Sequence, residues 1–178
     1  NGQTCTDSSA IGALAIDGLS SAIQTNSNYL IDVDNIWVTF GEPSGTGVDS
    51  RLIINDLLIV DKNMEINSRI FYMGPDARIV VMPGKKLRIL GFNMMKSCGN
   101  FLWQGIEVEP DTTGTNPTQL LISGATNIWD ARVGIDFTAS QTTLLSYQLG
   151  VINANFVNCE TGIRLTGVNE PEWVKIES

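Results

Sequence analysis

Three polar residues recur at near-constant spacing and carry side chains that sugar chemistry uses. Glu107, Asp136 and Arg164 follow one another at intervals of 29 and 28 residues. Two convergent carboxylates form the catalytic pair of many glycoside hydrolases, whereas lyases need a Lys or Arg base beside acidic Ca²⁺ ligands. The same residues also suit a solvated surface ladder with an ion pair, and we favour this second interpretation.

Other catalytic systems are excluded or weakly supported by residue type. The chain has no His, which removes Ser-His-Asp and Cys-His nucleophile systems and His-ligated zinc. Its three cysteines, Cys5, Cys98 and Cys159, are an odd number, so at least one is a free thiol or pairs outside the chain. No C-x-x-C spacing occurs, and we expect buried structural thiols.

Metal and aromatic ligand sites have only weak candidates. Asp32 and Asp34 could ligate Ca²⁺, but no EF-hand spacing is present, and acids that form turns explain them better. We therefore predict no metal and no cofactor. Of the four tryptophans, which could stack on sugar rings, Trp103 is expected to be a buried packing residue and Trp129 to face the core.

Composition limits the class of protein. The chain has 178 residues, of which 43% are hydrophobic and 17% charged, as expected for one domain with a sizeable core. Its net charge of −8 argues against binding of nucleic acid, which needs a basic face. No apolar run approaches the roughly 20 residues of a membrane helix, so we predict no membrane span.

An internal repeat predicts the elements that position the polar residues. The segment NIWDARVGIDF (127–137) matches NFVNCETGIRL (155–165) at an offset of 28, and GIEV (105–108) precedes GIDF (134–137) by 29 residues. A period of this length indicates a repeat architecture, and each period holds about three short strands. The sequence therefore predicts an all-β chain, a right-handed parallel β-helix of about 28 residues per coil over residues 51–178.

Stacked coils would place equivalent residues in ladders. Ile106, Ile135 and Ile163 would lie inside, with Val108, Phe137 and Leu165 two positions later, while Glu107, Asp136 and Arg164 face outward. Gly105, Gly134 and Gly162 are predicted at one corner, where glycine accepts a positive φ. Asn127 and Asn155 are predicted to stack at another corner.

The two ends of the chain are expected to differ. Residues 1–50 are predicted to form an N-terminal cap or linker segment that includes a short helix within 9–23. The segment EPEWVKIES (170–178) is predicted to form a strand that runs to the last residue, with Val174 and Ile176 alternating with Lys175 and Glu177, and with no cap after it. We expect the natural protein to continue there or to meet a partner, and the chain to be a processed product or a part of a longer protein.

One stretch resembles a known group of proteins. GPDARIVVMPGKKLRILG (74–91), followed by SCGNFLWQGIEV (97–108), resembles right-handed β-helix proteins that Bacteroidota export through the type IX secretion pathway. The resemblance covers about residues 52–166. It implies a parallel β-helix at the cell surface or outside the cell, and it carries no catalytic residue over to this chain.

Together these observations favour a non-enzymatic structural or adhesive module of an exported surface protein. Its expected partners are other protein chains or the rest of a larger surface protein, with polysaccharide as a further candidate. The alternative is a carbohydrate-active β-helix domain that binds or cleaves polysaccharide. A partner-bound component of a secretion or motility complex is a third hypothesis.

Overall fold

The computed structural model describes Cys5 and residues 14–15, 51–55, 57–61, 63–67, 70–112, 116–138, 149–167 and 174–177. Within these residues the protein is all-β, with parallel sheets and no helix. Leu14–Ala15 forms a strand instead of part of the helix predicted within 9–23, because it pairs with Leu52 and Ile53. Apart from Leu14, Ala15 and Cys5, the predicted cap lies outside the described residues.

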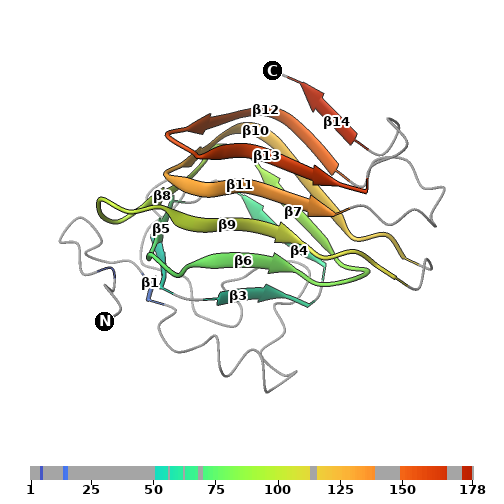
Figure 1. The fold of residues 1–178 in the computed structure, drawn as a ribbon, viewed down its shortest axis with the longest axis horizontal. Coiled ribbons are helices and arrows are strands. Elements are labelled where there is room, and N and C mark those ends of the chain that lie inside the picture. Colours follow the sequence, from blue (N-terminus) through green and yellow to red (C-terminus); the bar gives the residue numbers. More distant parts are fainter. Residues whose placement is uncertain are drawn as a thin grey trace.

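Fourteen strands of the described residues form two parallel sheets (Figure 1). The strands are β1 (Leu14–Ala15), β2 (Arg51–Ile54), β3 (Leu57–Val60), β4 (Met64–Asn67), β5 (Ile70–Met73), β6 (Arg78–Val81), β7 (Lys86–Leu90), β8 (Asn93–Ser97), β9 (Trp103–Val108), β10 (Gln119–Trp129), β11 (Ala131–Thr138), β12 (Leu149–Val157), β13 (Thr161–Thr166) and β14 (Val174–Glu177). The first sheet has the order β1-β2-β5-β8-β10-β12-β14. In addition, β7 pairs with β10, and β4 pairs with β7. The second has the order β13-β11-β9-β6-β3.

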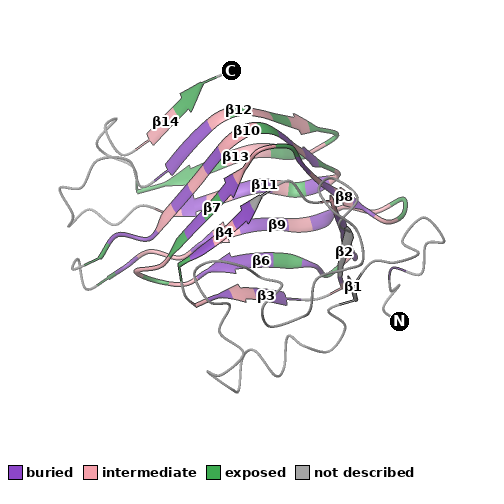
Figure 2. Ribbon diagram, turned by 180° about the vertical axis from the view of Figure 1, so that it is seen from behind, coloured by how far each residue is buried: buried purple, intermediate pink, exposed green. Residues whose placement is uncertain are grey.

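The core lies between the sheets and follows the alternation of each strand. In β7, Leu87 and Ile89 are fully buried while Lys86 and Arg88 are exposed. Ile106 and Ile135 are likewise fully buried, and Ile163 packs partly buried against them, as the predicted ladder requires. The parallel ladder Val108–Phe137–Leu165 is buried only for its first two members, because Leu165 lies on the terminal strand β13 of its sheet and is 40% exposed. Figure 2 shows this rise in exposure toward β13 and β14.

The first sheet bends where β7 gives way to β8. Gly91 and Gly124 have φ angles of +74° and +105°, and their backbones touch, since a Cβ on Gly124 would lie 2.7 Å from the Gly91 carbonyl oxygen. On β12 the same bend is made by Asn153, at φ +58°. Buried Asn93 supports the bend by donating to the Leu90 carbonyl at 2.7 Å. This bend divides the first sheet into two flat parts that face in different directions.

A second turn joins the two sheets at Asp130 and Asn158. Both residues have a positive φ, 57° and 54°, a region that Asn and Asp tolerate best after glycine. Asn158 donates to a carboxylate oxygen of Asp130 at 2.6 Å, and Ser97 donates to the other at 3.1 Å. The prediction that Asn127 and Asn155 make this corner is wrong, because they lie within β10 and β12. Their predicted stacking is confirmed by a 3.1 Å side-chain hydrogen bond.

The glycines predicted at a corner lie inside strands. Gly105, Gly134 and Gly162 belong to β9, β11 and β13, and only Gly105 has a positive φ, +110°. Gly105 pairs with Val133 across a register shift, so the three do not form one column. A bulge on β11 explains the difference, because Val133 and Gly134 together lie opposite Gly105, so β11 has one residue more than β9 at this point.

The register also limits the predicted period. Paired residues are 28 apart between β11 and β13, as for Ile135 and Ile163. Earlier in the chain the offset falls to 19, between Arg51 and Ile70, and it rises to 33 between Lys86 and Gln119. At the end of the chain the offset is 25, between Leu149 and Val174. Offsets of 28 to 29 residues therefore hold from β9 to β13 and not for the whole stack.

The N-terminal part of the chain is tied to the sheets by a disulfide. Cys5 and Cys98 are bonded, with 5.6 Å between their Cα atoms, and Cys159 is the free thiol. The expectation of three unpaired thiols is therefore wrong for two of them. The backbone N–H of Cys5 also donates to the Asn55 side chain at 2.7 Å, and Tyr72 is buried beside the disulfide. Cys5 thus packs against the outer side of β5.

Candidate functional site

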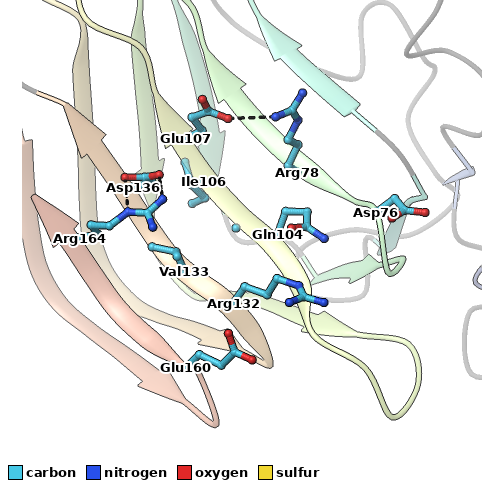
Figure 3. A pocket seen from close by; sticks show the side chains of 11 residues that line it. Asp76, Arg78, Gln104, Ile106, Glu107, Arg132, Val133, Asp136, Glu160 and Arg164 are labelled. Carbon is cyan, nitrogen blue, oxygen red and sulfur yellow. Dashed lines mark hydrogen bonds and ion pairs between the residues drawn. The ribbon is translucent and has the colours of Figure 1, made fainter. Parts of the chain in front are cut away.

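A shallow hollow of about 590 Å³ lies on the outer face of the second sheet, over β6, β9, β11 and β13 (Figure 3). We call it the charged hollow. Its ionisable side chains come from four acids and three arginines: Asp76, Glu107, Asp136 and Glu160 with Arg78, Arg132 and Arg164. All three residues singled out in the sequence as weak catalytic candidates are among them.

Glu107, Asp136 and Arg164 form one column across the sheet. Asp136 pairs in register with Glu107 on one side and with Arg164 on the other. Directly opposite side chains in a ladder are about 5 Å apart, the spacing expected from the sequence. The placement of this trio is therefore confirmed, whereas a catalytic role for it stays a prediction.

Each carboxylate in the column is held by an arginine. Arg164 contacts both oxygens of Asp136, with Nε donating at 3.0 Å to one and Nη2 donating to the other. Arg78 donates to Glu107 at 3.2 Å from the neighbouring strand β6. The hydrogen bond from Arg164 to Asp136, and then their Coulomb attraction, raise the pKa of the guanidinium. The two acids thus lie between two arginines, Arg164 within the column and Arg78 outside it, opposite Gly105.

A second row of polar side chains borders the hollow where the strands of this sheet begin. Gln104 is fixed by a 3.0 Å hydrogen bond to the Pro75 carbonyl. Arg132 and Glu160 extend into the hollow, and within the described residues neither makes an ion pair (Figure 3). The sequence reasoning missed this row. Its signal was present, because Arg132 and Glu160 occupy the same position of the 28-residue repeat with opposite charges.

The floor of the hollow is largely backbone, since the side chain of Ile106 is buried in the core. Gly105, Ile106 and Val133 line it between the two polar rows. A side chain at Gly105 would force the backbone to move, since a Cβ there would lie 1.6 Å from the carbonyl oxygen of Val133. The bulge therefore keeps this part of the face low, while the charged side chains stand up on either side.

The described residues offer no cluster for a metal ion. No group of three or more His, Cys, Asp or Glu side chains converges anywhere among them. The two calcium candidates, Asp32 and Asp34, lie outside the described residues. What the charged hollow presents chemically is a set of fixed hydrogen-bond donors and acceptors.

The tryptophans divide between core and surface. Trp103 is fully buried, as predicted, and its indole N–H donates to the Trp129 carbonyl at 2.8 Å. Trp129 does align with Val157, but both side chains are 37% exposed, so the core assignment for Trp129 is wrong. Its position at the outward-facing end of β10, next to the Asp130 turn, explains the exposure. Trp37 and Trp173 lie outside the described residues.

Comparison with known protein families, with curated proteins and with solved structures finds no match to this chain. In the part of the chain that the structure describes, no helix has the length and apolar character needed to cross a membrane.

Proposed function

We propose that this chain is a non-enzymatic structural or adhesive module of an exported cell-surface protein, built as a right-handed parallel β-helix. Parallel strands joined in register across two sheets support the coil architecture. The bend at Gly91 and Gly124 and the turn at Asp130 give the three faces that such a coil needs. The fold then acts as a stiff scaffold that carries a binding face.

The observation that carries the non-enzymatic assignment is the pairing in the charged hollow. A glycosidase needs one carboxyl group that keeps a proton for the leaving oxygen and one that is free to attack or to activate water. Glu107 and Asp136 are both engaged by arginines instead. Their charges are neutralised locally, and Asp136 has both oxygens occupied.

The disulfide supports the proposed location. Disulfide bonds persist in secreted and surface proteins and are rare in reducing compartments. The Cys5–Cys98 bond spans 93 residues of sequence and joins the N-terminal part to the sheets. An extracellular or surface location also agrees with the resemblance of residues 52–166 to exported β-helix proteins.

Two assays test this proposal together. Beads coated with the protein should be retained under flow on cell or matrix surfaces more strongly than beads coated with albumin. A depolymerisation screen over polysaccharides should give no new reducing ends. Activity that disappears in both Glu107→Gln and Asp136→Asn would overturn the non-enzymatic assignment, and retention no greater than that of albumin would overturn the adhesive one.

A carbohydrate-active domain is the second candidate, and the second polar row favours it. Arg132 and Glu160 are free of ion pairs among the described residues and stand beside the fixed Gln104. Such groups suit hydrogen bonds to sugar hydroxyls. Arg132→Gln and Glu160→Gln should weaken binding of a neutral glycan at this hollow, whereas Lys85→Gln, outside it, should not.

A further inference from the structure

A second hollow, of about 450 Å³, lies on the outer face of the other sheet, across β7, β10, β12 and β14. These strands lie side by side in Figure 2. Its lining side chains are basic, polar or apolar: Lys86, Arg88, Gln119, Leu120, Leu121, Ile152 and Lys175, with Gly150 between them. We call it the basic hollow.

The charge of the basic hollow is opposite to that of the whole chain. Three of its lining residues are cationic and none of them is acidic, in a protein with a net charge of −8. The charged hollow, by contrast, is lined by four acids and three arginines. Arg88 and Lys175 do have acidic neighbours, Glu65 at 3.1 Å and Glu177 at 2.9 Å, but these stand outside the basic hollow. Exposed pairs of this kind are weak, so a ligand anion can compete for the cations.

The cations stand at two ends of a row. The register runs from Arg88 to Leu121, then to Gly150, then to Lys175. Three steps of about 4.8 Å separate the outer two residues by about 14 Å. Lys86 lies two positions before Arg88 on the same face of β7. One small anion therefore fails to reach both ends, while a chain with repeated negative groups reaches them together.

The floor between the cations is apolar and low. Leu121 and Ile152 lie there half-buried, and Gly150 adds no side chain. A Cβ at Gly150 would lie 2.9 Å from a methyl group of Leu121, so the glycine lets that leucine lie flat across the floor. A flat apolar strip between cations matches a ring that has C–H groups on its face and an anionic group at its edge.

Sheet geometry favours a sugar polymer over a peptide. An extended peptide gains its affinity by adding a strand to a free edge. At this face the backbone groups of β10 and β12 already pair with both neighbours, so recognition rests on side chains. Linked sugar rings lie on such a face without needing backbone partners.

We propose that the basic hollow binds an acidic polysaccharide laid across β7, β10, β12 and β14. Carboxylates or sulfates of the polymer would contact Lys86 and Arg88 at one end and Lys175 at the other, with a ring on Leu121 and Ile152. The proposal rests on the adhesive function above, for which it names the class of ligand.

The test uses the whole chain and polygalacturonate, which carries one carboxylate on each ring. The neutral control is the same polymer after methyl esterification. The double variant Lys86→Gln/Lys175→Gln should bind polygalacturonate about tenfold more weakly at low ionic strength, since two exposed ion pairs contribute about 0.7 kcal/mol each. Lys85→Gln removes the same charge next to the hollow but not within it, and should change affinity by less than about twofold.

Calorimetric titration separates the outcomes. Equal binding of the esterified polymer, equal loss in the Lys85 control, or no binding of polygalacturonate would each overturn the proposal. If single-stranded DNA or polyglutamate binds as tightly as polygalacturonate, with the same dependence on Lys86 and Lys175, the ligand is another polyanion and the polysaccharide assignment is wrong. If polygalacturonate fails to bind while coated beads still adhere, the site is wrong and the adhesive function stands.

Discussion

Asp136 lies directly opposite Glu107 in the ladder between β11 and β9, so two carboxylates face each other on the outer side of the second sheet. Like charges at directly opposite positions destabilise a sheet. Two arginines offset this repulsion: Arg164 is paired with Asp136, and Arg78 is paired with Glu107. Each of the two acids at adjacent repeat positions is thus paired with an arginine of its own.

Removing one arginine should expose this repulsion. Arg164→Gln is expected to lower the urea midpoint of unfolding, because Asp136 then faces Glu107 without a counter-charge. Adding Glu107→Gln should recover most of the loss, since the opposing charge is gone. High salt should shrink the effect in the single variant, as expected for exposed charges. If Arg164→Gln and the double variant unfold at the same urea concentration, the two carboxylates do not repel measurably.

Two glycines of the second sheet, Gly105 on β9 and Gly162 on β13, should respond very differently to alanine. Gly105 has φ +110° and its Cβ would meet the Val133 carbonyl oxygen at 1.6 Å, whereas a Cβ on Gly162 finds Phe156 no closer than 3.4 Å. Gly105→Ala is expected to lower the free energy of unfolding by about 4 kcal/mol or more, because alanine is strained at this φ and its Cβ also forces the backbone to move. Gly162→Ala should change it by less than about 1 kcal/mol. Chemical denaturation measures both, and similar losses would show that the bulge is not rigid.

The contrast between these glycines shows what the sequence could and could not predict. The repeat predicted the pairing of Ile135 with Ile163 and the outward column of Glu107, Asp136 and Arg164, because stacked coils force matching residues together. It did not predict that the corner lies at Asp130 and Asn158, since Asn127 and Asn155 share the same period and residue type. Periodicity fixes which residues stack and leaves open where the backbone turns.

The polar surfaces were harder to predict for a related reason. Arg132 and Glu160 match in the repeat, but whether a matched pair closes into an ion pair depends on side-chain geometry. The basic hollow combines β7 and β14, whose residues Arg88 and Lys175 lie far apart in sequence and outside any visible repeat. The disulfide could not be predicted either, because an odd number of cysteines does not say which two are bonded.

The disulfide should carry a large share of the stability. Cys5→Ser/Cys98→Ser is expected to lower the free energy of unfolding by about 2–5 kcal/mol, because the bond closes a long loop in the unfolded chain. The wild type in reductant should unfold at the same urea concentration as the double variant, and Cys159→Ser should behave as the oxidised wild type. Titration of thiols in unfolded, non-reduced protein should find one thiol, Cys159. Three thiols, or no shift on reduction, would contradict the bond.

Cys159 should react slowly with alkylating agents until the pH is well into the alkaline range. Burial raises the pKa of its thiol, an effect that outweighs the backbone hydrogen bonds at the site that lower it. The thiolate is the nucleophile, so the rate of reaction with iodoacetamide should begin to rise at a higher pH in the folded protein than in the same protein unfolded in urea. Because the pKa of Cys159 is higher in the folded than in the unfolded state, the folded protein holds this proton to a higher pH. The contribution of Cys159 to the free energy of unfolding is therefore fully present below the unfolded-state pKa, and it is lost as the pH rises through the folded-state pKa. The Cys5–Cys98 bond leaves one thiol to observe, and Cys159→Ser supplies the blank. A folded-state profile at or below the unfolded one would show that the thiol is not shielded from water in solution.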